Sequence, residues 1–183
     1  MMALIVIDVQ KAFEDPAWGS RNNPQAEGQI AFLLESWRKR EMPIIYVRHV
    51  SRERFARGTV GFEFKTEAMP LPGETVLEKT VNSAFIGTDL EQRLRELSCD
   101  TVVIVGLTTN HCVETTTRMA GNLGFTAYLV SDATATFDRV GPDGYVHKAE
   151  EIHRMTLANL HEEFATIVTT RELMERLTDP EVL

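Results

Sequence analysis

The sequence predicts an α/β protein in which helices cover both faces of a doubly wound, mainly parallel six-stranded sheet. Short apolar runs rich in β-branched residues recur along the chain, and longer amphipathic stretches separate them. A strand without polar alternation must be covered on both faces, as in a parallel sheet between helices. The length of 183 residues suits one hydrophobic core. We therefore expect a Rossmann-like, three-layer single domain over residues 1–183.

Six short runs are predicted to be the buried strands of this sheet. They are residues 4–7, 44–47, 75–77, 101–105, 127–130 and 165–168. Because strands and helices alternate with short connections, the crossovers should be right-handed. In such a sheet the ligand site lies at the carboxyl ends of the strands. Polar residues just after a strand are therefore the first candidates for chemistry.

The helices are predicted from apolar periodicity and from capping residues. Asn23 and Pro24 suit the cap and first position of a helix that Pro43 ends, and Thr88 or Asp89 suits the cap of the next. Further helices are expected over residues 110–123, about 145–164 and 170–177. Residues 50–73, which contain several glycines and prolines, predict a long surface loop. Loops of that length are uncommon unless they are functional.

Composition excludes several classes of partner. The formal net charge of -8 opposes binding to nucleic acid, which depends on lysine and arginine at the phosphates. No apolar run is long enough to cross a membrane, and the start of the sequence lacks the features of a signal peptide. Two cysteines distant in sequence do not suggest a disulfide framework. We expect a soluble cytoplasmic protein whose partner is a small-molecule substrate.

Three polar residues follow predicted strands and together suggest nucleophilic catalysis. Cys112 begins a predicted helix, where the helix dipole favours the thiolate, and Lys79 would add a second positive influence. Asp8 could accept the proton of the thiol and later return it to a leaving amine. An aspartate that ends a buried strand needs a cationic partner, and Lys79 is the natural one. Spacing alone leaves open that Cys112 is a buried inert thiol.

The histidines give a weaker signal. His111 precedes Cys112, but adjacent helical residues point about 100° apart, so His111 is not expected to be its base. It suits a pocket wall or an exposed helix position, and His49 follows a strand as a site residue would. The histidines show no zinc-binding spacing, and glycine-rich phosphate loops are absent. We expect no metal and no cofactor.

The residues around these candidates carry a family resemblance. The matching segments are residues 4–10 (Leu-Ile-Val-Ile-Asp-Val-Gln) with Phe13, Glu78-Lys79 with residues 82–85 (Asn-Ser-Ala-Phe), residues 106–120, and Ser131-Asp132-Ala133. With these segments the chain resembles the isochorismatase-like cysteine hydrolases, which include nicotinamidases and N-carbamoyl amide hydrolases. The resemblance implies a catalytic triad of Asp8, Lys79 and Cys112. It also implies a cis peptide between Leu107 and Thr108, an oxyanion hole of the Thr108 and Cys112 amides, and a homo-oligomer.

The sequence departs from the patterns of two groups within this family, and these differences narrow the activity that the resemblance implies. Metal-dependent nicotinamidases of this family carry an aspartate two residues before a histidine, whereas here Val47 precedes His49. Members that cleave the vinyl ether of isochorismate lack the cysteine that is present here as Cys112. The resemblance therefore points to cleavage of a C–N bond in a small amide, ureide or carbamoyl compound through a Cys112 thioester. The alternatives are hydrolysis of a nitrile or another acyl compound, and an idle member that only binds a small molecule. The candidates for the substrate pocket are Phe13, Trp18, His49, Asn82, Phe85 and His111.

Overall fold

A computed structural model of the protein describes residues 1–178 and contains the predicted sheet. Its six strands are β1 (Met2–Ile7), β2 (Ile44–His49), β3 (Thr75–Lys79), β4 (Thr101–Leu107), β5 (Thr126–Ala135) and β8 (Thr166–Val168). They are ordered β3-β2-β1-β4-β5-β8, and all neighbouring pairs are parallel. The predicted fold class is thus confirmed. Most strands extend beyond the predicted runs, by two residues at the carboxyl ends of β2, β3 and β4.

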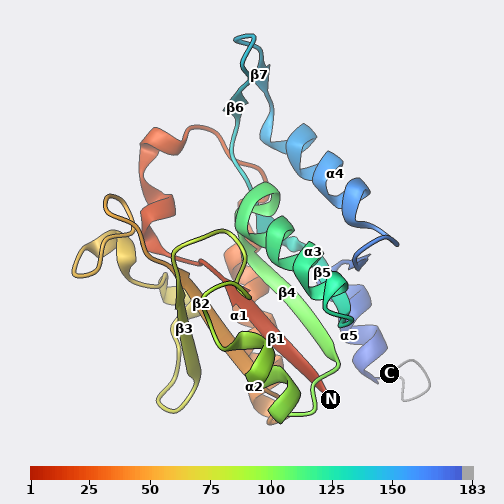
Figure 1. The fold of residues 1–183 in the computed structure, drawn as a ribbon. Helices are drawn as coiled ribbons and strands as arrows, with labels where there is room; N and C mark the ends of the chain where they lie inside the picture. Colours follow the sequence, from red (N-terminus) through yellow and green to blue (C-terminus); the bar gives the residue numbers. More distant parts are fainter. Residues whose placement is uncertain (179–183) are drawn as a thin grey trace.

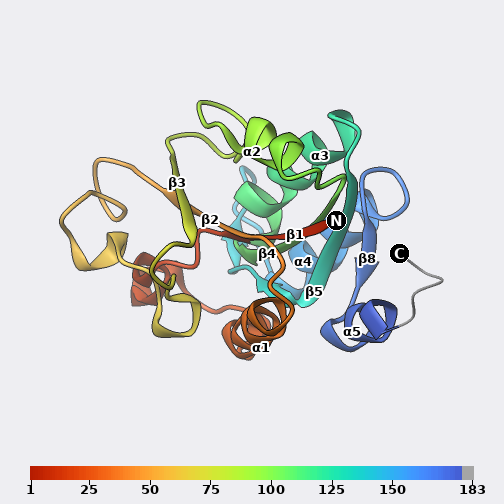
Figure 2. The same cartoon turned by 90° about the horizontal axis from the view of Figure 1, so that it is seen from below.

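Helices cover both faces of the sheet (Figures 1 and 2). One face packs against α1 (Ala26–Lys39) and α5 (Thr170–Thr178), and the other against α2 (Leu90–Glu96), α3 (Glu114–Asn122) and α4 (Ala149–Leu160). Alternate residues of β1 supply the two cores, since Ile5 packs on the second face while Leu4 packs beneath α1. This is the alternation that a strand buried on both sides requires.

The order of the strands reverses beside β1. The chain passes from β1 outward to β2 and β3, and then returns to place β4 on the other side of β1. Strands β1 and β4 approach closely at Gly106, where a Cβ atom would lie 2.0 Å from the Ile7 carbonyl oxygen. Gly106 also has a positive φ of 126°, which a larger residue would rarely adopt. A reversal of this kind is where open parallel sheets bind ligands.

Two predicted helix boundaries differ from the structure, and one of two predicted cap residues is selected. Helix α1 begins at Ala26, because the Asn23 side chain is used elsewhere and donates to the carbonyls of Ser131 and Thr134. Thr88, rather than Asp89, accepts a bond from the Leu90 amide at the start of α2. Helix α4 begins at Ala149 rather than near residue 145. The preceding residues form a hairpin of β6 (Arg139–Val140) and β7 (Val146–His147), which the prediction missed.

The long segment after β2 is less exposed than predicted. It contains two short 3-10 helices, Val60–Phe62 and Thr66–Ala68, and it buries the side chains of Phe55, Phe62, Phe64 and Lys65. Phe64 forms an antiparallel bridge with Gln10, and the Lys65 amide donates to the Val9 carbonyl. These contacts fasten the segment over the residues that follow β1. Within residues 1–178, no helix combines the length and the apolar character that crossing a membrane requires.

Candidate active site

The three residues proposed for catalysis come together at the carboxyl edge of the sheet. Asp8 directly follows β1, Lys79 is the last residue of β3, and Cys112 lies in the turn after β4. Strand register aligns them: Ile7 pairs with Gly106 on one side of β1, and His49 pairs with Lys79 across β2 and β3. The site therefore sits where the order of the strands reverses, as the general rule for such sheets predicts.

Asp8 and Lys79 form a buried ion pair. Lys79 Nζ donates to Asp8 Oδ2 at 2.6 Å, and both side chains have 0% exposure. The backbone of Asp8 has a φ of 49° and its amide donates to the Val47 carbonyl, which turns the side chain off the end of the strand. Burial raises the pKa of Asp8, while the charge of Lys79 and hydrogen bonds from Lys79 and Cys112 oppose that rise. A carboxylate with a raised pKa is a stronger base.

Cys112 faces this pair, but as a thiol rather than as a thiolate. Its sulfur, one Asp8 carboxylate oxygen and one His49 ring nitrogen all lie within 4.8 Å of one another. Burial, followed by the negative charge of Asp8, raises the pKa of Cys112 to about 12, and Lys79 only partly opposes this. Lys79 lowers this pKa as expected, but the net shift is upward, so the expectation that the site favours the thiolate is wrong. Desolvation of the thiolate outweighs this effect of Lys79.

Cys112 lies on a π-helical turn, Thr109–Val113, that precedes α3. Single π turns often occur at functional sites. The peptide bond between Leu107 and Thr108 is cis, and Thr108 Oγ1 lies 3.1 Å from His111 Nδ1. Both Thr108 and His111 line the site together with Cys112. Burial lowers the pKa of His111, and the nearby charge of Arg139 adds to this.

Buried polar contacts hold this turn from behind, and no motif in the sequence predicts them. Thr109 Oγ1 lies 2.9 Å from Nδ1 of the buried His153 on α4, and Thr136 Oγ1 donates to Asn110 Oδ1 at 2.5 Å. These contacts join residues 26 to 44 positions apart in sequence. Predicting these contacts would require knowing which helices and strands pack against each other. The turn is thereby tied to α4 and to the end of β5.

His49 lies beside the ion pair and is held by its backbone. Its Nδ1 is 3.3 Å from Lys79 Nζ, and its ring packs edge-on against Phe55. The buried Gln10 side chain accepts a bond from the His49 amide at 2.7 Å and donates to the His49 carbonyl at 3.1 Å. Burial, and then the charge of Lys79, lower the pKa of His49. The imidazole is therefore neutral at pH 7.

A small cavity of about 160 Å³ opens above Cys112. Five of the six residues predicted for the substrate pocket line it, namely Phe13, Trp18, His49, Asn82 and His111. Phe85 does not, because its ring stacks on Phe125 and packs against the core. Phe55 lines the cavity instead and was missed, since it lies in the long segment whose conformation the sequence does not specify. Phe137 supports the wall from behind by stacking on Phe13 and Trp18.

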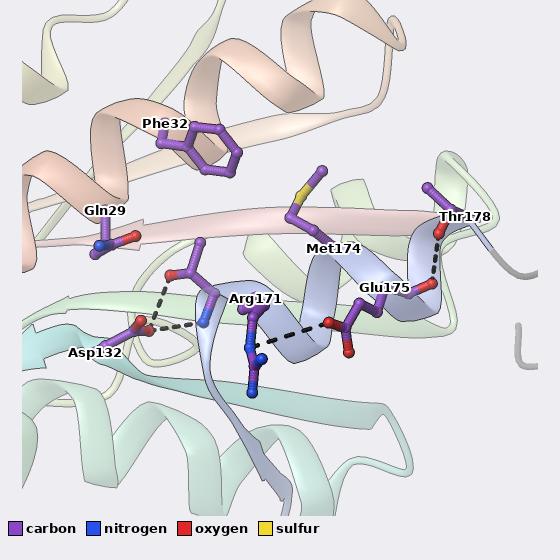
Figure 3. Close-up of a pocket in the computed structure, with 8 residues that line it drawn as sticks. Gln29, Phe32, Asp132, Arg171, Met174, Glu175 and Thr178 are labelled. Atoms are coloured by element: carbon purple, nitrogen blue, oxygen red, sulfur yellow. Dashed lines mark hydrogen bonds and ion pairs between the residues drawn. The ribbon is translucent and has the colours of Figure 1, made fainter.

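A larger hollow of about 520 Å³ lies elsewhere, between α1 and α5 (Figure 3). Its wall includes Phe32 of α1 and Met174 of α5, and it shares no residue with the cavity above Cys112. Asp132, an acid in its wall, already accepts bonds from the Thr170 amide and hydroxyl at the start of α5. Within the described part of the chain, the residues lining this hollow include no cysteine, so it supplies no thiol nucleophile.

Asp8, His49 and Cys112 are also residue types that can hold a metal ion. They fit a dication poorly, because the Lys79 ammonium already lies 2.6 Å from the Asp8 carboxylate and 3.3 Å from the His49 ring. Val47, at the position where the metal-dependent nicotinamidases that the sequence resembles carry an aspartate, is a buried apolar residue of the core. The positive charge beside Asp8 and His49 is thus supplied by Lys79, which leaves these residues poorly suited to bind a metal ion.

Comparisons with known proteins identify the family to which the chain is similar. The model of the isochorismatase domain matches residues 2–172. The chain is 50% identical to an uncharacterized isochorismatase family protein, YrdC of Bacillus subtilis, over 94% of both chains. It is 30% identical to nicotinamidase 3 of Arabidopsis thaliana, over 96% of this chain and 88% of that protein. It is also 31% identical to the ureidoacrylate amidohydrolase RutB of Agrobacterium fabrum, over 64% of this chain and 47% of RutB.

Solved structures give the same result. A putative hydrolase of the isochorismatase family from Chromobacterium violaceum superimposes with a TM-score of 0.93 at 44% identity, covering 96% of this chain and 93% of that one. A cysteine hydrolase from Pseudomonas syringae superimposes with a TM-score of 0.89 at 27% identity, covering 97% and 92%. On the domain match, the relatives and the shared fold, the chain belongs to the isochorismatase family of hydrolases.

Proposed function

We propose that this protein hydrolyses a C–N bond of a small amide, ureide or carbamoyl compound through a thioester on Cys112. The observation that carries this proposal is the buried Asp8–Lys79 ion pair, which places a carboxylate base within 4.8 Å of the Cys112 sulfur. The similarity to a nicotinamidase and to an amidohydrolase supports the choice of bond. The cavity of about 160 Å³ supports a small substrate.

The first half-reaction starts from the neutral thiol. As the Cys112 sulfur attacks the carbonyl carbon, its proton passes to Asp8, because a free thiolate is disfavoured by a pKa of about 12. Backbone amides of Thr108 and Cys112 stabilise the oxyanion that forms, a contribution of about 3 kcal/mol in comparable sites. Asp8 then gives its proton to the leaving nitrogen. The C–N bond breaks, and an acyl group remains on sulfur.

The second half-reaction restores the enzyme. Asp8, again a carboxylate, takes a proton from water, whose oxygen attacks the thioester carbon. The C–S bond breaks, and the sulfur recovers a proton from Asp8 as the acid product leaves. Lys79 takes no part in these proton transfers and holds Asp8 in place through the bond of 2.6 Å. It keeps the carboxylate oriented toward Cys112 and balances its charge.

The test is to find the acyl group. The protein is mixed with a panel of small amides, ureides and carbamoyl compounds, quenched with acid, and mapped by mass spectrometry after proteolysis. An adduct on the Cys112 peptide is expected, with none in Cys112→Ala and an unchanged adduct in Cys99→Ala, the matched control for the other, buried cysteine. An adduct on any other residue would overturn the proposal.

A second candidate is a member of the family that binds a small molecule without turning it over, since a fold shared with hydrolases does not by itself imply turnover. A nitrile included in the panel tests a third candidate, because a nitrile hydrolase would add Cys112 across the C≡N bond as a thioimidate, which water converts to the thioester with loss of ammonia, and would spare the amide. Ligand binding by calorimetry, without product and without adduct, would support the binding protein. Product that disappears in Cys112→Ala would exclude it.

A further inference from the structure

We propose that His49 is a further catalytic residue, which holds the water that hydrolyses the Cys112 thioester through a hydrogen bond from its Nε2–H group. The inference rests on the proposed function and adds a role that the Asp8, Lys79 and Cys112 set leaves unfilled. Asp8 can remove a proton from water, but a single acceptor does not fix where the oxygen points. A donor on the other side of the water does.

The tautomer of His49 follows from its neighbour. An ammonium group only donates hydrogen bonds, so Nδ1, at 3.3 Å from Lys79 Nζ, must accept. In a neutral imidazole the proton is then on Nε2. The burial of the ring and the positive charge of Lys79 both lower the pKa of His49 and keep it neutral. The Lys79 ammonium thus orients two residues at once. It lies 2.6 Å from the Asp8 carboxylate oxygen and 3.3 Å from Nδ1 of the His49 ring.

The ring is also fixed in space. Gln10 binds both the amide and the carbonyl of His49, and Phe55 packs against the ring with centroids 5.4 Å apart. Gln10 itself has 0% exposure and donates as well to the Phe62 carbonyl, so it is anchored on both sides. A donor held this firmly costs little ordering entropy when it binds a reactant. Catalysis uses groups of that kind.

The spacing suits a bridging water. Two hydrogen bonds of about 2.8 Å that meet at a tetrahedral oxygen span roughly 4.6 Å. A carboxylate oxygen of Asp8 and a ring nitrogen of His49 lie within 4.8 Å of each other and of the Cys112 sulfur. Asp8 Oδ1 is buried and accepts no bond of normal geometry from residues 1–178, and in the thioester Cys112 no longer carries a proton to donate, so one carboxylate oxygen is available to accept.

The water would enter after the amine has left. It donates one hydrogen to Asp8 and accepts from His49 Nε2–H, which leaves its second lone pair free to face the thioester carbon. As the C–O bond forms, that hydrogen passes to Asp8, and the C–S bond then breaks with return of the proton to sulfur. His49 keeps its own proton throughout. It therefore acts in deacylation, not in acylation.

Two substitutions separate this role from simple support of Lys79. His49→Asn keeps an acceptor near the Nδ1 position but has no group that reaches Nε2, whereas His49→Gln extends an N–H donor toward Nε2 and loses the acceptor. Rapid-quench mass spectrometry with the best amide from the panel would measure acylation and deacylation of Cys112 separately. His147→Asn, on the exposed β6–β7 hairpin, is the matched control.

We expect His49→Asn to slow deacylation by at least 30-fold with acylation within about 3-fold, so that the thioester accumulates and kcat falls more than kcat/KM. His49→Gln should retain most of the deacylation rate. The reverse order of the two variants, or an equal loss in both steps, would overturn the role given to His49. If the wild-type protein forms no adduct at all, the proposed function fails instead, so the two failures are distinguishable.

Discussion

Lys79 Nζ and Asp8 Oδ2 lie 2.6 Å apart, and both side chains are buried with 0% exposure. Residues 71 positions apart in sequence are thereby joined across β1, β2 and β3. Buried pairs of this kind contribute little net stability, but each partner left alone is costly. In the proposed mechanism this pair serves the chemistry at Cys112 rather than the stability of the fold.

A double-mutant cycle on this pair should separate stability from activity. Asp8→Asn and Lys79→Met should each lower the free energy of unfolding by about 3–5 kcal/mol, since each leaves an uncompensated buried charge. The double variant should recover part of that loss, as measured by urea unfolding. Activity should fall by about 10²–10⁴ in Asp8→Asn and should not return in the double variant. A double variant no more stable than the worse single variant would contradict the pairing.

The pH dependence of alkylation should report the raised pKa of Cys112. With a pKa of about 12, the thiolate fraction rises about tenfold for each pH unit between pH 7 and 10, and so should the rate of reaction with iodoacetamide. The reaction at pH 7 should be slow even in an active enzyme, so low resting reactivity does not identify an idle protein. Mass spectrometry of the Cys112 peptide gives the rate, with Cys99→Ala to remove the second thiol. A plateau below pH 9 would show that the thiolate is stabilised after all.

Phe55 and Phe85 form a matched pair for the pocket. Phe55 lines the cavity above Cys112, whereas Phe85 stacks on Phe125 at 5.8 Å between ring centroids. Phe55→Ala should lower kcat/KM by about tenfold or more, because it removes apolar contact with the substrate and the support of the His49 ring. Phe85→Ala should lower the free energy of unfolding by about 2 kcal/mol and leave kcat/KM within about threefold. The opposite pattern would mean that the substrate contacts Phe85 rather than the cavity that Phe55 lines.

The sheet and the three polar residues at its carboxyl edge could be predicted from the sequence because both depend on local pattern. Buried strands of a parallel sheet are continuous apolar runs, and residues after such runs share one edge wherever the helices lie between them. Asp8, Lys79 and Cys112 could therefore be placed near one another without coordinates. The identity of their roles came from the family motifs.

What the sequence did not predict depends on contacts made over long separations. The β6–β7 hairpin, the burial of Phe55 and the contact between Thr109 and His153 each require knowing which segments meet in space. The pKa of Cys112 was predicted in the wrong direction for a related reason. A helix terminus is visible in sequence, whereas the desolvation that outweighs it depends on everything packed around the thiol.

Glu27 should govern stability in acid. It lies on α1 at 8% exposure, where Arg21 binds both of its oxygens at 2.8 and 3.0 Å and Lys65 binds one at 2.7 Å. Arg21 follows the segment that carries Trp18, and Lys65 belongs to the segment that carries Phe55. Although burial opposes it, hydrogen bonds from Arg21 and Lys65 lower the pKa of Glu27 to about 2. One carboxylate thus joins both segments that wall the cavity to the body of the protein.

A folded-state pKa below the ordinary value of 4.5 means that the stabilisation is complete above pH 4.5 and is lost as the pH falls toward 2. The shift corresponds to about 3 kcal/mol. Glu27→Gln should therefore unfold at lower urea than wild type at pH 7, and the gap should narrow between pH 4.5 and pH 2. Glu35→Gln, which removes an exposed and solvent-screened pair with Lys39 on the same helix, should show a much smaller convergence. A gap that stays constant with pH would mean that the carboxylate charge contributes nothing and that only packing was lost.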